Sequence, residues 1–292
     1  MNGWKKAKRY HEDDIAFIIY TAFPFYLTRA RAVRLTWISR VTNYYFLSSV
    51  PDPSLPVTVT NNTGEDYQSN TKKIFYGLEL IYKAQLSIPA SSRHKWYFLV
   101  GCDTYVNVPH LLKRLDAYDS QIPYFIGGSV GTQTCFHSNG TSYKSLFVGG
   151  NTAHVYSAAL VDAIYPHLIQ YVNSIWPQPN HTSSAQSDVA LSCLIFHLGF
   201  NMTIIPGFWR NTPDKTIQEF GLTEALSEKE PSSYHYIKPE QMIDLDEFYV
   251  YQHIDRLIND RNWNELKHFI RFFIGTHYKI LRKIYRERLE IN

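Results

Sequence analysis

Continuous runs of apolar, often β-branched residues are the feature that most constrains the fold of this chain. Ile15–Thr21 reads IAFIIYT and Lys95–Val100 reads KWYFLV, with no alternation of polar and apolar positions. Such strands are buried on both faces, as in parallel sheets that carry helices on each side. Helical patterns follow them at Leu27–Val41, where arginines and apolar residues take opposite faces, and at Asn107–Tyr118.

The rest of the chain continues this alternation of strands and helices. Further predicted strands are Tyr44–Ser48, Val57–Thr60, Tyr124–Gly127, Phe147–Val148, Met202–Ile205 and Ser233–Ile237. Further predicted helices are Tyr67–Ala84, Ser157–Val172, Ser187–Leu198 and Pro239–Tyr251. The order predicts an α/β fold with a mostly parallel sheet and crossover helices. Ligands bind such sheets beyond the carboxyl ends of the strands.

No linker, repeat or low-complexity segment divides the 292 residues, and 45% hydrophobic content suits one domain with a sizeable core. We predict that residues 1–252 form the main domain. Residues 253–292, helical in pattern and basic near their end, are expected to be an extension packed on it. The net charge of +3 is too small to favour nucleic acid or a membrane surface, so no nucleic-acid partner is expected.

Neither the cysteines nor the glycosylation motifs decide in which cellular compartment the protein resides. The three cysteines are Cys102, Cys135 and Cys193, which allow at most one disulfide. Consensus sites for N-glycosylation occur at Asn61, Asn139, Asn180 and Asn201. No apolar stretch reaches the roughly 18–20 residues that span a bilayer, and Met1–Asp14 is too polar for a signal peptide. The protein is either soluble where it is made or anchored by a segment outside this sequence.

The stretch Trp96–Val108, WYFLVGCDTYVNV, places the carboxylate of Asp103 directly after a buried strand. A carboxylate at this position could hold a metal ion that binds a diphosphate. A nucleotide-sugar donor needs such an ion, because its leaving group is a negatively charged phosphate chain. A divalent cation neutralises that charge as the glycosidic C–O bond breaks. The alternative is that Asp103 caps the helix that follows.

This stretch resembles the segment written W-F-L-x-A-D-D-D-T-Y-V in the family of Fringe and core 1 β1,3-galactosyltransferases. Other segments resemble that family in the same order, namely Arg31–Trp37, Tyr45–Leu47, Thr71-Lys72, Pro123–Gly127, Ser187–Leu191, Ser233–Ile237 and Leu245–Tyr251. Together they cover most of Ile15–Gln252. The resemblance implies a GT-A fold, which is Rossmann-like, with a mixed, mostly parallel sheet flanked by helices.

The resemblance also implies roles for individual residues. Asp103 and His235 would bind the metal, Mn²⁺ or Mg²⁺, and one imidazole shifts the preference of an oxygen site towards Mn²⁺. Asp188 would be the general base that takes the proton of the acceptor hydroxyl. The residues that would bind the donor are Asp103, Thr21, Arg29, Lys72 and Cys102.

Each role has a structural alternative. Asp188 begins an apolar helix and could cap it. His235 could be a partly buried histidine between two tyrosines, and Arg29 a solvated helix charge. Cys102 could donate to Zn²⁺ if deprotonated, or be a small buried residue.

The resemblance predicts an inverting, metal-dependent glycosyltransferase. It would move a galactose- or N-acetylhexosamine-type sugar from a UDP-sugar to a glycan or glycoprotein hydroxyl, forming a β1,3 linkage. It also implies a Golgi or ER lumen location, as the soluble part of a type II membrane protein whose anchor lies outside this sequence. A homodimer is an open alternative to a monomer.

The family's acidic trio is reduced here to Gly101-Cys102-Asp103, which puts donor affinity and metal preference in doubt. The alternative function is therefore a catalytically inactive family member, acting as a chaperone or glycan-binding protein. Retention of Asp103, Asp188 and His235 together favours the enzyme.

Overall fold

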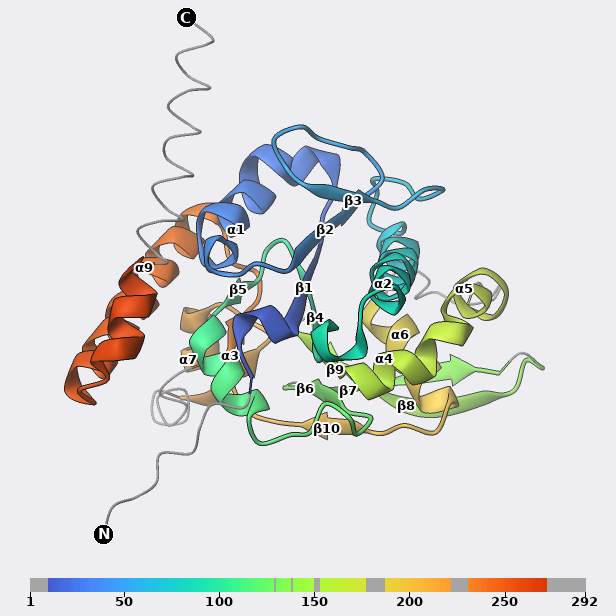
Figure 1. The fold of residues 1–292 in the computed structure, drawn as a ribbon. Coiled ribbons are helices and arrows are strands. Elements are labelled where there is room, and N and C mark those ends of the chain that lie inside the picture. Colours follow the sequence, from blue (N-terminus) through green and yellow to red (C-terminus); the bar gives the residue numbers. More distant parts are fainter. Residues whose placement is uncertain are drawn as a thin grey trace, which may run out of the picture.

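The strands predicted as buried runs lie at the centre of one large sheet (Figure 1). The computed structural model describes residues 10–128, 130–137, 139–149, 153–176, 187–221 and 231–271. Within them, seven strands form a sheet in the order β10-β6-β9-β4-β1-β2-β3. Their bounds are β1 Ile15–Tyr20, β2 Tyr44–Ser48, β3 Val57–Val59, β4 Trp96–Gly101, β6 Phe125–Gly127, β9 His154–Ser157 and β10 Met202–Ile204. Neighbours are parallel except where β9 pairs with β4 and β6, which confirms the mixed, mostly parallel sheet.

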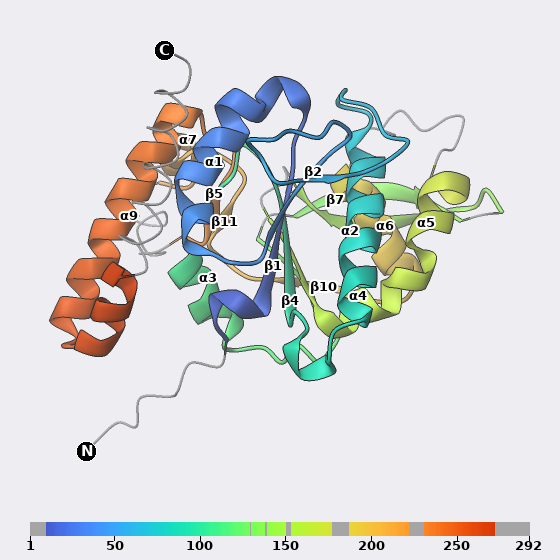
Figure 2. The same ribbon diagram turned by 45° about the horizontal axis from the view of Figure 1, so that its top comes forward.

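Helices cover both faces of this sheet, as Figure 1 and the turned view of Figure 2 show. One face carries α1 Arg31–Leu35, α3 Val108–Leu115 and α9 Pro239–Asn259. The other carries α2 Asn70–Leu86, α4 Ala158–Ile164, α5 Leu168–Gln170 and α6 Ser187–His197. Because successive side chains of a strand point to opposite faces, Phe17 of β1 joins the first core and Ile18 the second. This is why the strand is apolar at every position.

Two smaller β structures flank the central sheet. A three-stranded sheet is formed by β11 Phe208–Trp209, β12 Ser233–Tyr234 and β5 Tyr105–Val106, and α7 Pro213–Phe220 follows β11. A hairpin is formed by β7 Val130–Phe136 and β8 Ser142–Val148. The disulfide Cys135–Cys193 ties the hairpin to α6, and the Tyr143 hydroxyl donates to the Cys193 carbonyl over 2.8 Å. Cys102 remains free and buried.

Three predicted elements differ from the structure in their continuity. The helix expected over Ser157–Val172 is α4, then a 3-10 turn that contains Pro166, then α5 and a π turn. The helix expected over Leu27–Val41 is a π turn, then α1, then a 3-10 turn, because Thr36 leaves the helical region at φ −107° and ψ −119°. The strand expected over Ser233–Ile237 ends at Tyr234, since Tyr236 takes a left-handed conformation at φ 60°. The sequence pattern does not predict β5, β7, β9 or β11, and it predicts only the last two residues of β8.

The helix α9 continues through residue 252, where we predicted a domain boundary, and residues 263–271 are helical as well. His253 and Leu257, beyond that boundary, are buried. Residues 272–292 lie outside the described residues, so the domain division stays a prediction. In the part of the chain that the structure describes, no helix combines the length and apolar character needed to cross a membrane.

Candidate active site

A cavity of about 310 Å³ lies at the carboxyl ends of β1 and β4, the edge where α/β sheets bind ligands. Most of the predicted site residues line it. Among its lining residues are Thr21, Arg29, Tyr67, Cys102, Asp103 and His235. The structure thus brings together five of the seven residues that the sequence singles out, from three distant parts of the chain.

The pairing of β5 with β12 carries His235 to Asp103. Tyr105 lies opposite Tyr234 in this antiparallel ladder, and the Ile237 N–H donates to the Asp103 carbonyl over 2.9 Å. As a result, His235 Nε2 lies 3.3 Å from Asp103 Oδ1. The His235 side chain is 3% exposed and packs at a tilt of 34° against the Tyr236 ring, with 3.8 Å between centroids.

The Asp103 carboxylate is held ionised by its neighbours. Burial alone would raise its pKa, but the hydrogen bond and charge of His235 and the charge of Arg29 lower it below its usual value. The Arg29 guanidinium lies 3.4 Å from Asp103 Oδ2 and stacks over the Phe25 ring at 4.5 Å. An ionised carboxylate therefore faces the cavity with a cation on one side and an imidazole on the other.

Asp103 and His235 suit a divalent cation of the Mn²⁺ or Mg²⁺ type. They offer one hard oxygen and one imidazole nitrogen at a single point of the cavity. No cluster of three or more Asp, Glu, His or Cys side chains arranged for a metal occurs among the described residues. If these two residues held such an ion, its other coordination positions would be free for substrate oxygens and water.

Asp188 is the second residue of α6 and does not line the large cavity. With Tyr20 and His154 it borders a gap that is too narrow for a water molecule. One of its oxygens accepts from the adjacent Val189 N–H over 3.0 Å, so the carboxylate lies against the first turn of α6. The role of Asp188 as the base therefore stays a prediction.

The two lysines at the start of α2 differ in position. Lys72, predicted to bind the donor, is exposed and does not line the cavity. Lys73 is fully buried instead. Its Nζ donates to the Thr21 carbonyl over 3.0 Å and lies 3.4 Å from Glu65 Oε1. The buried lysine thus supports the cavity wall from behind, a role that the sequence does not reveal.

Cys102 lines the cavity as a free, buried thiol. Burial, with the nearby charge of Asp103, raises the pKa of this thiol to about 12. Without a metal the thiol is therefore protonated at neutral pH, as expected of a small buried residue.

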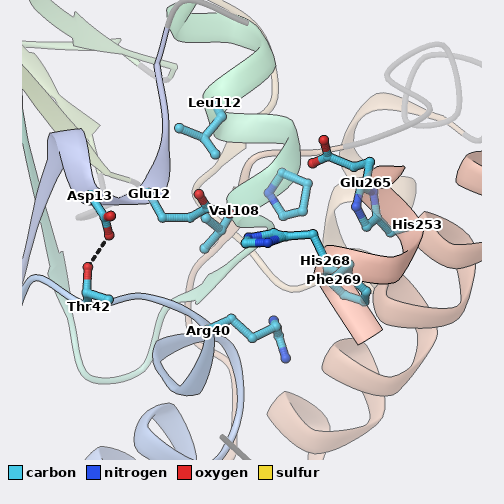
Figure 3. Close-up of a pocket in the computed structure, with 11 residues that line it drawn as sticks. Glu12, Asp13, Arg40, Thr42, Val108, Leu112, His253, Glu265, His268 and Phe269 are labelled. Atoms are coloured by element: carbon cyan, nitrogen blue, oxygen red, sulfur yellow. Dashed lines mark hydrogen bonds between the residues drawn. The ribbon is translucent and has the colours of Figure 1, made fainter. Parts of the chain in front are cut away.

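A second cavity, of about 160 Å³, lies among the N-terminal turn, α3 and the C-terminal helical region (Figure 3). Its polar lining residues include Glu12, Arg40, His253, Glu265 and His268. None of the seven predicted site residues lines it. We therefore place the candidate active site in the larger cavity.

The fold brings a carboxylate and an imidazole together in a cavity at the carboxyl ends of the strands, and comparison with known families gives the class of protein. The sequence model of the Fringe-like family matches residues 10–256. The chain therefore belongs to the Fringe-like family and is a glycosyltransferase. Among solved structures, the chain is similar to a glycosyltransferase involved in the glycosylation of the major capsid of PBCV-1. The match has 17% identity and a TM-score of 0.43, and covers 80% of this chain and 98% of the other.

Proposed function

We propose that this glycosyltransferase is inverting and metal-dependent, and that it moves a sugar from a UDP-sugar to a hydroxyl of a glycan. The observation that carries the proposal is the 3.3 Å approach of Asp103 and His235 inside a cavity of about 310 Å³. These two residues would hold Mn²⁺ or Mg²⁺, which when bound neutralises negative charge on the diphosphate. Arg29 lies close enough to Asp103 to add a second positive charge.

Asp188 is proposed as the general base. The acceptor hydroxyl gives its proton to the Asp188 carboxylate as its oxygen forms a bond to the anomeric carbon. The bond from that carbon to the diphosphate breaks, and its electron pair leaves on UDP. Attack on the side opposite the diphosphate inverts the anomeric centre, so an α-linked donor yields a β-linked product, for which we propose a β1,3 linkage.

Calorimetric titration of UDP, with and without Mn²⁺, tests the donor site. We expect the wild type to bind UDP only with the metal, and Asp103→Ala and His235→Ala to lose this binding. Asp244→Ala, which removes an exposed carboxylate of α9 outside the cavity, is the matched control and should bind like the wild type. Metal-independent binding, or none, would instead support the chaperone or glycan-binding alternative.

Replacement of the proposed base separates binding from catalysis. Asp188→Asn should keep metal-dependent UDP binding and lose turnover by about 10²-fold or more. Turnover would be followed as UDP release in the presence of UDP-galactose or UDP-N-acetylglucosamine and a glycan acceptor. Turnover equal to that of the wild type would reject Asp188 as the base.

We also propose that the enzyme works in a Golgi or ER lumen. The glycosylation sites at Asn61, Asn139 and Asn201 are exposed, while Asn180 lies outside the described residues. The disulfide between β7 and α6 suits an oxidising compartment. Expression through a secretory pathway should give a glycosidase-sensitive mass shift, and a triple Asn→Gln variant at the three exposed sites shows how much of it they carry.

A further inference from the structure

Tyr20 is the last residue of β1 and lies between the two carboxylates of the proposed mechanism. It lines the large cavity together with Asp103, and it borders Asp188 across a gap that is too narrow for a water molecule. Burial, and then the charges of Asp103 and Asp188, raise the pKa of its hydroxyl, so the phenol is neutral. The residue as a whole is 9% exposed.

The absence of a side chain at Gly101 makes room for the Tyr20 ring. Tyr20 and Gly101 are register partners in the parallel pairing of β1 with β4. A Cβ atom at position 101 would lie 3.2 Å from the Tyr20 hydroxyl and 2.8 Å from Asp103 Oδ1. The two oxygens therefore lie close over the glycine, and a side chain at position 101 would require the Asp103 carboxylate or Tyr20 to shift.

The position of Tyr20 relative to the proposed reaction indicates which part of the donor it meets. In an in-line displacement, the transferred sugar lies between the leaving diphosphate and the attacking hydroxyl. Asp103 is proposed at the diphosphate end and Asp188 at the acceptor end. Tyr20 borders both residues and therefore lies beside the sugar, where a neutral phenol can donate to a sugar hydroxyl or accept from it.

We propose that the Tyr20 hydroxyl hydrogen-bonds the transferred sugar of the donor, and that Gly101 is needed to admit the Tyr20 ring. This inference rests on the proposed function and assigns its sugar-binding residue. Tyr20 is thereby a specificity-determining residue, because a directed hydrogen bond to one sugar hydroxyl discriminates between donors that differ in that hydroxyl.

The test compares UDP with UDP-sugars on Tyr20→Phe, which removes only the hydroxyl. Calorimetry with Mn²⁺ would use UDP, UDP-galactose, UDP-glucose and UDP-N-acetylglucosamine. We expect the affinity for UDP to stay within about twofold, while the affinity for the best-bound UDP-sugar falls roughly 3- to 10-fold. Tyr45→Phe is the matched control, because its hydroxyl pairs with His94 outside the cavity, and it should leave all affinities unchanged.

A set of deoxy analogues of the best-bound UDP-sugar completes the test. The analogue that lacks the bonded hydroxyl should bind the wild type and Tyr20→Phe equally, a result that a structural role for the tyrosine would not produce. Equal losses for UDP and UDP-sugar would overturn the inference, and so would no loss for either. A wild type that does not bind UDP would instead refute the proposed function, and this inference with it.

Discussion

The buried ion pair behind the active site gives the most direct measure of what holds the cavity wall in place. Lys73 is completely buried, and its ammonium group reaches both the Thr21 carbonyl and the Glu65 carboxylate. Lys73→Met keeps the length and apolar stem of the side chain but removes the charge and the hydrogen bond. The variant therefore leaves Glu65 without its cation and the carbonyl without its donor.

The expected cost follows from the surroundings of Glu65. Removing one partner of a buried ion pair costs about 3–5 kcal/mol. We expect the lower end, about 3 kcal/mol, because the Glu65 side chain is 21% exposed and keeps hydrogen bonds from Ser48 and Ser49. This corresponds to a change of roughly 100-fold in the unfolding equilibrium constant. Lys73→Met/Glu65→Gln should recover part of the loss, since no unpaired charge remains.

Urea unfolding followed by circular dichroism measures this cost, and the adjacent lysine provides the control. Lys72→Met makes the same chemical change on an exposed side chain, so it should alter the unfolding free energy by less than about 0.5 kcal/mol. Equal shifts for the two variants would show that Lys73 is not held as the structure describes. A double variant Lys73→Met/Glu65→Gln that is no more stable than Lys73→Met would show the same.

Three further predictions concern the site and its support. Gly101→Ala should abolish Mn²⁺-dependent UDP binding, because its Cβ would displace the Asp103 oxygen that faces His235; unchanged calorimetric affinity would refute this. The pKa of Asp103 is lowered on folding, so its ionisation contributes stability that is present above the unfolded value of 3.8 and lost as the pH falls through the lower folded value. Urea midpoints of the wild type and Asp103→Asn should therefore differ at pH 6 and converge only below pH 3.8; a constant difference would contradict the reasoning. Cys193→Ser removes a disulfide between residues 58 positions apart and should lower the free energy of unfolding by about 4 kcal/mol. Its thermal midpoint should fall, and the wild type under reducing conditions should show the same lower midpoint.

The central strands could be predicted because their signal is local. The run at Ile15–Tyr20 is apolar at every position, since each face of the strand is covered by helices. The strand β7 reads VGTQTCF and lacks such a run. It is stabilised by its partner strand, by α6 and by a disulfide, none of which is visible in the segment itself. The short strand β9 likewise depends on the two neighbours between which it lies.

Within the site, Asp103 could be located from the sequence because it follows a strong strand signal. His235 is paired with it only through the ladder between β5 and β12, so its role depended on family resemblance. The lysines show the limit of motif matching. A motif locates the start of α2, but which lysine turns inward depends on Glu65 and the Thr21 carbonyl, which come from other parts of the chain.

The reduced acidic run, Gly101-Cys102-Asp103, is compatible with a working site because its three positions have different surroundings. A side chain at position 101 would require the Asp103 carboxylate or Tyr20 to shift, because its Cβ would lie 2.8 Å from Asp103 Oδ1 and 3.2 Å from the Tyr20 hydroxyl. Position 102 is 6% exposed, and burial keeps its thiol neutral. Only position 103 meets both an imidazole and a guanidinium, and there a carboxylate is retained. The two positions without an acid are thus ones that do not face the imidazole and the guanidinium, while the carboxylate that does face them is present.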